Sequence, residues 1–331
     1  MPRYSGPVET RLLSAQSPGD LDEAAELLRE GGLVAFPTET VYGLGGLALE
    51  PLAVRAIYAA KGRPATNPVI VHVLGEKEAR PLCARWPLEA RQLAARFWPG
   101  PLTLVLPRTE MVPDEVTAGG PTVAVRAPSH PAARALLERI GAPLAAPSAN
   151  RAEHVSPTTA AHVLRDLNGR IDAVVDGGRC PFGIESSVLS IGDGPPRLLR
   201  AGAIPRPDLE DVLGPIEAGP AESSVAPSPG LQKRHYAPAA RVRIAPAPAL
   251  ERVVRELGSN GPVGVLSLSA DEVSGASAVH RLSSDAKGYA RDLYAALRDL
   301  EDRGCSAIAV EAVPDDPAWD AIRDRLARAA A

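Results

Sequence analysis

Cysteine and aromatic residues are scarce in this sequence. Its 331 residues include three cysteines, three tryptophans and three phenylalanines. Cys83, Cys180 and Cys305 lie far apart and form no C-x-x-C pair, which excludes a disulfide framework and a cysteine-rich zinc site. A reducing compartment suits a chain of this kind.

Long apolar runs are also missing. No stretch approaches the length of a bilayer-spanning helix, and the polar N-terminus lacks the apolar core of a signal peptide. The net charge of −4 argues against a protein that binds nucleic acid over a broad surface, although it leaves room for a local basic cleft. We therefore expect a cytoplasmic protein with no membrane partner.

Helix and strand patterns are intermixed along the first two thirds of the chain. A helix is expected to begin after Ser17, and a second one at Pro51, with Leu52, Ile57 and Tyr58 on its apolar face. We expect further helices at 87–97, 130–140 and 157–167, a loop at 37–49, and strands at 33–36, 69–74, 102–106, 122–126, 143–146, 171–175, 187–191 and 196–200. Two pairs of successive strands lack an intervening helix, namely 102–106 with 122–126 and 187–191 with 196–200. The pattern therefore predicts an α/β fold with a mixed, partly antiparallel sheet.

The composition changes near residue 214. Proline, glycine and serine are interspersed from Gly214 to Pro238, which is typical of a stiff linker. We expect a domain over 10–213, a linker over 214–238 and a smaller α/β domain over 239–331. In the smaller domain we expect strands at 241–245, 263–267 and 307–310, and helices at 248–257, 284–303 and 317–330.

One glycine-rich segment matches a nucleotide-binding pattern only formally. Gly43-Leu-Gly45-Gly-Leu-Ala48 fits G-x-G-x-x-A. In the dinucleotide fold these glycines lie where a strand turns directly into a helix, whereas here the helix begins only at Pro51. We therefore disfavour a dinucleotide site. A Walker-type pattern is absent from the sequence, so any nucleotide would be held without a P-loop.

A more informative set of polar residues surrounds the expected strand at 69–74. Lys61, Arg63, Asn67 and His72 place two cations, an amide and an imidazole at this apolar, β-branched segment. Most charges near a helix C-terminus are simply solvated, and a lone histidine is often a satisfied core residue. Cations at the edge of an apolar core are costly unless an anion meets them, so the combination favours a phosphorylated ligand.

Polar residues also stand at the ends of other expected strands. They are Arg126, Ser148, Asn150, Glu185, Ser186 and Arg200. Ser156 with Pro157 is typical of an N-cap for the 157–167 helix, and a capped helix N-terminus can also attract an anion. G-x-S-x-G is absent from the sequence, so nothing suggests a hydrolase nucleophile.

Taken together, these motifs resemble one family. The quoted segments are Pro37-Thr-Glu-Thr40-Val-Tyr-Gly43-Leu44, Lys61-Gly-Arg63, Asn67-Pro, His72, Arg126, Ser148-Ala-Asn150 and Gly183-Ile-Glu-Ser186. They are similar to the motifs of the YrdC-like threonylcarbamoyl-AMP synthases. Ser228-Pro-Gly-Leu-Gln-Lys-Arg-His235-Tyr-Ala-Pro238, followed by a small α/β domain, resembles the longer two-domain form. The resemblance implies a YrdC-like twisted sheet of parallel and antiparallel strands with flanking helices, and a smaller Rossmann-like C-terminal domain.

The resemblance also implies roles for individual residues. Lys61 and Arg63 would be catalytic, with Lys61 close to the phosphates of ATP. L-Threonine would be bound by Thr40, His72, Arg126, Ala146 and Ser186. ATP would be bound by Arg63, Asn67, Thr122, Ser148, Ser156, Arg200 and Tyr236, the last of which would close over the nucleotide from the linker. A general base is not identified, although Glu39 and Glu185 are available.

The implied reaction converts L-threonine, bicarbonate and ATP into threonylcarbamoyl-adenylate, pyrophosphate and water. Mg²⁺ would arrive on ATP, and no other metal is expected. The product would pass to a tRNA threonylcarbamoyl transferase, as the first step in modifying the adenosine next to the anticodon. Direct contact with tRNA, if it occurs, would be weak.

The sequence departs from the family pattern in a few places, and other functions stay open. Arg151-Ala-Glu153 stands where the family usually carries a Ser-Gly pair, and Ser187 replaces the commoner threonine. One alternative is an RNA-binding module with a basic cleft, which the scarcity of aromatic residues near the cations disfavours. Another is a carbamoyl-transfer domain like those of hydrogenase-maturation proteins, whose companion zinc-finger and acylphosphatase-like segments this sequence lacks.

Overall fold

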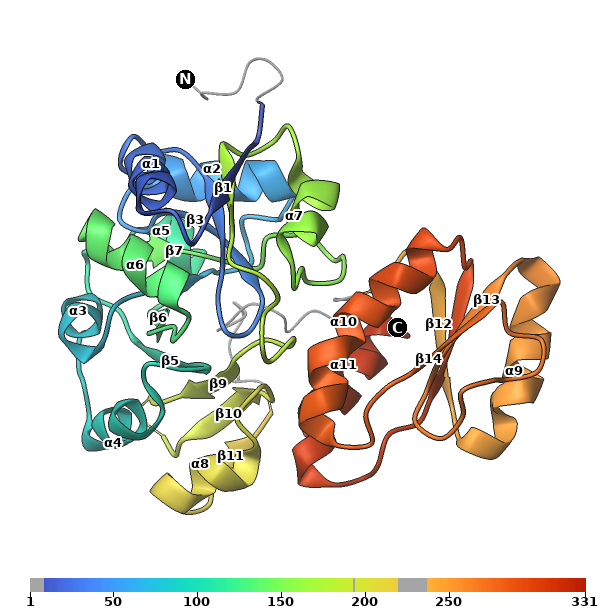
Figure 1. The fold of residues 1–331 in the computed structure, drawn as a ribbon. Helices are drawn as coiled ribbons and strands as arrows, with labels where there is room; N and C mark the ends of the chain where they lie inside the picture. Colours follow the sequence, from blue (N-terminus) through green and yellow to red (C-terminus); the bar gives the residue numbers. More distant parts are fainter. Residues whose placement is uncertain (1–8, 193, 220–236) are drawn as a thin grey trace. The chain divides into compact units, whose positions relative to one another are not determined.

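The computed structural model describes residues 9–192, 194–219 and 237–331 (Figure 1). The chain forms two compact units. The first comprises Met1–Ala152, Pro157–Pro181 and Glu185–Leu231, and the second comprises Glu153–Ser156, Phe182–Ile184 and Gln232–Ala331. Two short segments from the first two thirds of the sequence therefore belong to the second unit.

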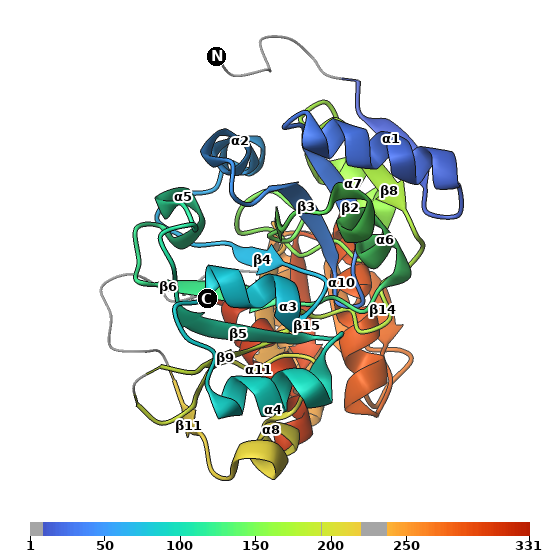
Figure 2. The same ribbon diagram turned by 90° about the vertical axis from the view of Figure 1, so that its left-hand side faces the viewer.

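The first unit is built on a mixed sheet, which has eleven strands within the described residues. Their order is β1-β8-β2-β3-β7-β4-β6-β5-β9-β10-β11. The bounds are β1 (Arg11–Ser14), β2 (Val34–Pro37), β3 (Tyr42–Leu47), β4 (Ile70–His72), β5 (Leu102–Pro107), β6 (Thr122–Arg126), β7 (Leu144–Ala145), β8 (Ala173–Asp176), β9 (Ser187–Ser190), β10 (Arg197–Arg200) and β11 (Glu217–Ala218). β5 pairs antiparallel with β6 (Figure 2), and β9 pairs antiparallel with β10 (Figure 1), which confirms the predicted mixed sheet.

Helices pack on both faces of this sheet. They are α1 (Pro18–Arg29), α2 (Pro51–Lys61), α3 (Glu76–Ala79), η1 (Arg80–Leu82), α4 (Leu88–Phe97), α5 (Asp114–Thr117), α6 (Pro131–Ile140), α7 (Ala160–Leu167) and α8 (Arg206–Leu213). Alternate residues of β2 enter different apolar clusters, since successive side chains of a strand point to opposite faces. Phe36 joins the cluster that contains α1 and α6, whereas Ala35 joins the cluster that contains α2, α4 and α7.

The predicted loop at 37–49 is wrong, because Pro37 ends strand β2 and Tyr42–Leu47 forms strand β3. β2 and β3 pair as an antiparallel hairpin in which Pro37 faces Tyr42. The glycines of β3 are needed for close packing: a Cβ on Gly45 would lie 2.6 Å from Cε1 of Phe36. The G-x-G-x-x-A segment is thus part of a strand, which agrees with our rejection of a dinucleotide turn.

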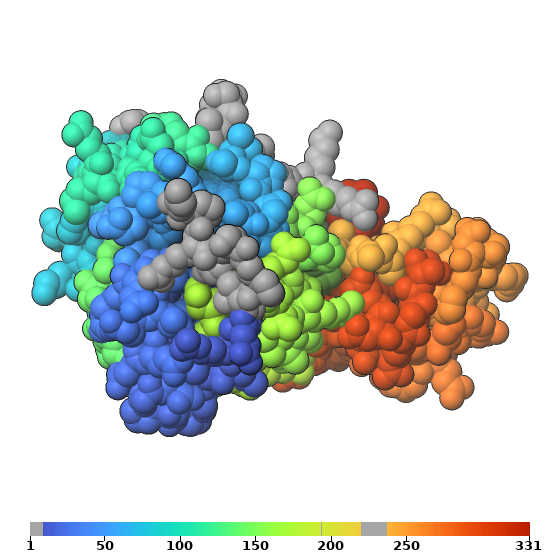
Figure 3. Space-filling model, turned by 90° about the horizontal axis from the view of Figure 1, so that it is seen from above, coloured from blue at the N-terminus to red at the C-terminus, as the bar shows by residue number. Residues whose placement is uncertain are grey.

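Two details of the helices differ from the sequence prediction. Leu52 is 72% exposed rather than buried, and α2, in light blue, lies at the surface of the first unit (Figure 3). Helix α7 begins only at Ala160, because Thr159 rather than Ser156 is its N-cap and accepts a hydrogen bond from the backbone N–H of His162. By contrast, Ser17 caps α1 as predicted, accepting from the N–H of Asp20.

The second unit contains a separate parallel sheet with strand order β12-β15-β13-β14. Its elements are β12 (Arg241–Ala245), η2 (Ala247–Ala249), α9 (Leu250–Leu257), η3 (Gly258–Asn260), β13 (Val263–Ser267), β14 (Ala278–Arg281), α10 (Ala286–Asp302), β15 (Ala307–Glu311), η4 (Pro317–Trp319) and α11 (Asp320–Ala329). Parallel strands alternating with helices are typical of a Rossmann-like domain. β14 was not predicted, since its side chains are only half-buried and show no apolar run.

None of the helices in the described residues is both long enough and apolar enough to cross a membrane.

Candidate active site

The site is built where several strands of the first sheet end or begin. β4 and β6 are parallel, and His72 lies opposite Arg126 at the last position of both strands. β5 runs antiparallel to β6 and parallel to β9, so the starts of β5 and β9 lie at the same edge as Arg126. Residues far apart in sequence are therefore brought together by sheet register alone.

Arg126 is buried and forms an ion pair with Glu39, with 2.9 Å between Nη2 and Oε1. Its Nε donates to the backbone carbonyl of Gly100 at 3.3 Å. Glu39 lies in the four-residue connection between β2 and β3, where polar residues would normally be exposed to water, yet it is only 3% exposed. The acid therefore meets the cation inside the protein.

His72 is buried beside this pair. Burial, and then the positive charge of Arg126, lower the pKa of the imidazole from 6.5 to about 3. Its Nδ1 has no hydrogen-bond partner among the described residues. At neutral pH the ring is uncharged and can donate to, or accept from, a polar ligand.

Hydroxyl groups line the same region. Oγ of Ser186 lies 2.8 Å from Oγ1 of Thr103, and Nη2 of Arg200 donates to Oγ of Ser186 at 3.1 Å. Arg200 also donates to the carbonyl of Ser186 through Nε and Nη2. The arginine implied for ATP is thus bonded directly to a serine implied for threonine.

The other residues implied for threonine lie on the neighbouring segments. Thr40 is fully buried, and its Oγ1 lies 2.8 Å from Oγ1 of Thr38. Ala146 is buried next to β4, where its N–H donates to the carbonyl of Ile70.

Lys61 connects two of the sequence motifs. Its Nζ donates to the carbonyl of Ser148 at 2.6 Å and to the carbonyl of Asn150. The side chain is buried, and burial followed by the nearby charge of Arg63 holds the pKa of the ammonium well below its usual value. The strand register explains why Lys61 contacts Ser148 and Asn150. β7 runs antiparallel to β4, so the loop that follows β7 returns toward the start of β4.

Arg63 is held by the loop that leads into β4. Nε donates to the carbonyl of Asn67 at 3.2 Å, and Nη2 donates to the carbonyl of Pro68 at 3.0 Å. Asn67 is buried, and its carbonyl also accepts from Oη of Tyr58. This loop lies at the opposite end of β4 from His72.

Thr122 begins β6, whereas Arg126 ends it, so Thr122 lies at the edge of the sheet where the parallel strand β4 also begins. Ser156 is buried and belongs to the second unit. Tyr236 and most of the predicted linker fall outside the described residues. The implied lid role of Tyr236 therefore stays a prediction.

The site thus has two groups of residues around short strands. Lys61, Arg63, Asn67, Thr122 and Ser148 lie toward the start of β4 and β6 or in the adjoining loops. His72 and Arg126 end these strands, and Glu39, Ser186 and Arg200 join them through the contacts above. β4 has three residues, so at a rise of about 3.3 Å per residue the two groups are within reach of one small molecule or of two that react.

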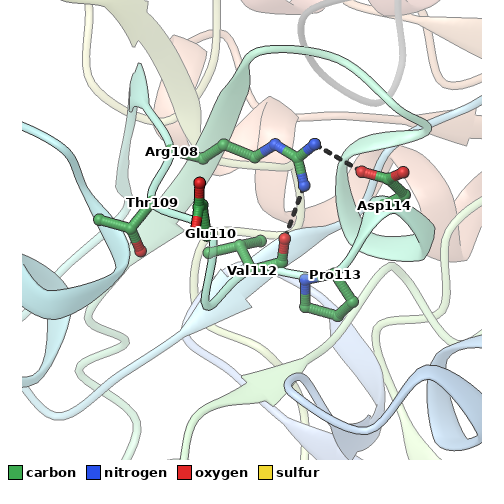
Figure 4. A pocket seen from close by; sticks show the side chains of 6 residues that line it. All are labelled: Arg108, Thr109, Glu110, Val112, Pro113 and Asp114. Carbon is green, nitrogen blue, oxygen red and sulfur yellow. Dashed lines mark hydrogen bonds and ion pairs between the residues drawn. The ribbon is translucent and has the colours of Figure 1, made fainter.

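Two surface hollows lie elsewhere. One of about 400 Å³ is lined by Arg108, Thr109, Glu110, Val112, Pro113 and Asp114 (Figure 4). Arg108 spans it, donating to the carbonyl of Val112 and pairing with Asp114. The other, of about 590 Å³, is lined by Glu76, Lys77, Arg80 and Pro81. None of the site residues described above lines either hollow.

Sequence reasoning missed three residues of this site. Thr103 gave no signal, because it lies inside an apolar strand. Thr38 stood inside the motif that begins at Pro37 but was given no role of its own. Its Oγ1 accepts from the N–H groups of Thr40 and Val41 and so fixes the loop between β2 and β3. Glu39 was considered only as an available base, since nothing in the sequence shows that a hairpin loop folds inward onto Arg126.

A buried set of cations, hydroxyls and a neutral imidazole at strand ends defines an α/β enzyme that binds small charged substrates. The comparisons with known proteins specify the class. A family model described as "Telomere recombination" matches residues 26–202, and the "Threonylcarbamoyl-AMP synthase, C-terminal domain" model matches residues 204–331. The chain belongs to the threonylcarbamoyl-AMP synthase family, in its two-domain form, and is an adenylyl-transferring enzyme.

Relatives match over almost the whole chain. Threonylcarbamoyl-AMP synthase of Pyrococcus abyssi is 43% identical over 320 residues, covering 92% of each chain, and that of Bacillus subtilis is 43% identical over 332 residues, covering 96% of this chain and 94% of the relative. Among solved structures, P. abyssi Sua5 complexed with L-threonine matches with a TM-score of 0.89 and 40% identity, covering 98% of this chain and 97% of that one. These matches confirm the predicted family and the predicted two-domain α/β fold.

Proposed function

We propose that this chain converts L-threonine, bicarbonate and ATP into threonylcarbamoyl-adenylate, pyrophosphate and water. Family membership supports the overall reaction, and a solved relative is described as a complex with L-threonine. The observation that carries the proposal is the division of the site into two groups at the two ends of β4 and β6. One group suits an amino acid, and the other suits a nucleotide.

The amino-acid end would bind threonine through charge and hydrogen bonds. Arg126 offers a guanidinium whose Nη2 makes no hydrogen bond within the described residues, and a guanidinium can hold a carboxylate by two parallel bonds. The neutral His72 and the Ser186 hydroxyl supply uncharged partners for the remaining polar atoms. Thr40 would contribute a hydroxyl, and Ala146, which bonds to Ile70 at the first position of β4, would line the space between the two groups.

The nucleotide end would bind ATP through Lys61, Arg63, Asn67, Thr122 and Ser148. The resemblance also implies ATP contacts for Arg200, which bonds to Ser186 of the other group, and for Ser156 and Tyr236. Two of the three N–H groups of a charged Lys61 bond to carbonyls, which leaves one for a phosphate oxygen. Mg²⁺ would arrive bound to ATP as part of the substrate. Among the described residues, no group of three His, Cys, Asp or Glu side chains forms a metal site of its own.

The chemistry requires positioning and charge neutralisation more than a covalent nucleophile. The threonine nitrogen forms a bond to the bicarbonate carbon, and water and a proton leave to give a carbamate. A carbamate oxygen then forms a bond to the α-phosphorus of ATP, and the bond from that phosphorus to the bridging oxygen breaks to release pyrophosphate. Lys61 and Arg63 would stabilise the negative charge that moves onto the leaving group.

The product is a mixed anhydride, and we propose that a tRNA threonylcarbamoyl transferase consumes it in the cytoplasm. Three buried free cysteines suit that reducing compartment. We propose that direct contact with tRNA is weak, since the net charge is −4.

The reaction can be tested by its product. Purified protein is incubated with Mg²⁺, ATP, L-threonine and ¹³C-bicarbonate, quenched rapidly and analysed by mass spectrometry. We expect an adenylate that contains both threonine and one ¹³C atom. A threonyl-adenylate without the label would contradict the proposed order of bond formation. An Arg63→Ala variant should lose the product while remaining folded.

A further inference from the structure

Glu39 is a buried acid that the mechanism above does not use. It lies in the connection between β2 and β3, which the Oγ1 of Thr38 fixes by donating to the carbonyl of Val41 and accepting from the N–H of Thr40. The loop is thus shaped to point inward, although an acidic loop residue would be better solvated outside. A buried charge at such a position needs a reason.

Arg126, the ion-pair partner of Glu39, satisfies only part of the hydrogen-bonding capacity of the Glu39 carboxylate. Oε1 lies 2.9 Å from Nη2 of Arg126, but the pair lacks hydrogen-bond geometry. Within the described residues, neither carboxylate oxygen of Glu39 makes a hydrogen bond, and Nη2 of Arg126 makes none either. Native proteins rarely bury polar atoms in this state, and each such atom costs free energy until a partner arrives.

An α-amino acid complements this arrangement. It carries a carboxylate and an ammonium on one carbon, and the protein presents a guanidinium and a carboxylate side by side with open hydrogen-bonding positions. We propose that Glu39 binds the α-ammonium of the amino-acid substrate while Arg126 binds its α-carboxylate. This assignment rests on the proposed function and adds to it a residue that selects amino acids over other carboxylic acids.

A purely structural role for Glu39 makes a different prediction. If Glu39 only held Arg126 in place, its loss would weaken every carboxylate ligand to the same degree. If Glu39 binds the ammonium, its loss would weaken only ligands that carry one. Ligands without the ammonium would bind equally well or more tightly, because Arg126 would no longer share its charge with an acid.

The test compares two ligands by isothermal titration calorimetry on the full chain. They are L-threonine and 2,3-dihydroxybutanoate, in which a hydroxyl replaces the ammonium. Glu39→Gln keeps the side-chain shape and removes the charge, whereas Glu115→Gln makes the same change at a surface pair with Arg55 and serves as the control. Glu39→Asp keeps the charge and provides a second variant, and circular dichroism checks that each protein is folded.

We expect Glu39→Gln to weaken threonine binding by roughly ten- to a hundredfold, as befits the loss of one charged hydrogen bond. Binding of 2,3-dihydroxybutanoate should be unchanged or tighter, and Glu39→Asp should recover part of the affinity for threonine. Equal loss for both ligands, or no loss for threonine, would overturn the proposal.

Wild-type protein provides a test that does not depend on a variant folding. It should bind threonine at least tenfold more tightly than 2,3-dihydroxybutanoate, and equal affinities would also overturn the role of Glu39. Failure of the proposed function looks different: wild-type protein would then bind no threonine, or would bind it without forming pyrophosphate from ATP.

Discussion

His72 and Arg126 occupy paired positions at the ends of the parallel strands β4 and β6. Both side chains are buried, so the imidazole shares a poorly solvated environment with a permanent cation. Burial, and then the charge of Arg126, lower the pKa of His72 to about 3. The sheet register therefore imposes a neutral histidine at the amino-acid end of the site.

The low pKa of His72 predicts how stability depends on pH. The unfolded chain binds a proton at His72 below pH 6.5, whereas the folded protein does so only near pH 3. Stability is therefore unaffected by this group above pH 6.5 and falls by about 1.4 kcal/mol per pH unit as the pH drops through that window. In urea titrations, the free energy of unfolding of His72→Gln should therefore fall by about 1.4 kcal/mol less per pH unit than that of the wild type. His154→Gln, a substitution at an exposed histidine, is made for comparison; equal slopes for His72→Gln and wild type would contradict the account.

Lys61 predicts proton uptake when ATP binds. Its pKa is held well below the usual value by burial and by Arg63, and a phosphate anion would raise it again. Calorimetric titrations with ATP, repeated over a pH series in buffers of different ionisation enthalpy, should therefore show a net uptake of protons at the pH where Lys61 of the free protein titrates. Lys61→Met should bind ATP more weakly and lack this uptake. Uptake that persists unchanged in the variant would assign the effect to another group.

Thr103 predicts a selective effect on threonine use. Its Oγ1 lies 2.8 Å from Oγ of Ser186, and both residues are buried. Thr103→Val keeps the volume but removes that partner, so we expect a rise in KM for threonine, little change in KM for ATP and a loss of about 1 kcal/mol in stability. Steady-state kinetics and urea unfolding measure these quantities. A selective rise in KM for ATP instead would show that our division of the site is wrong.

Gly45 predicts a packing defect in the hairpin that carries Glu39. A Cβ at this position would lie 2.6 Å from Cε1 of Phe36 and 3.2 Å from the carbonyl oxygen of Val34. Gly45→Ala should therefore reduce stability by about 1–3 kcal/mol, measured by urea unfolding. Gly192→Ala is a suitable comparison, because a Cβ there would meet nothing within 4 Å. Equal stability of the two variants would show that the hairpin tolerates the extra atom.

The sequence predicted elements well where apolar periodicity and caps agreed. Ser17 and Pro18 marked the start of α1, and the strands at 241–245 and 263–267 were predicted to the residue. β3 was missed because three glycines normally indicate a turn, whereas here they admit neighbouring side chains of the core. Tertiary packing therefore overrode local propensity.

The site was predicted less completely than the fold. Motif residues such as His72 and Arg126 stood out because polar groups at the ends of apolar strands are costly without a ligand. Their pairing, and the approach of Glu39 to Arg126, depend on the register of strands more than 50 residues apart in the chain. No local pattern carries that information, so Thr103 and the role of Glu39 emerged only from the structure.

Pyrophosphate release from Mg-ATP tests the central claim most directly. L-Threonine and bicarbonate are each omitted in turn from reactions with the full chain. The account predicts release that depends strictly on both. Release without threonine would mean plain ATP hydrolysis or another acceptor, and no release from folded protein that binds RNA would favour an RNA-binding module; either result would contradict the proposed function.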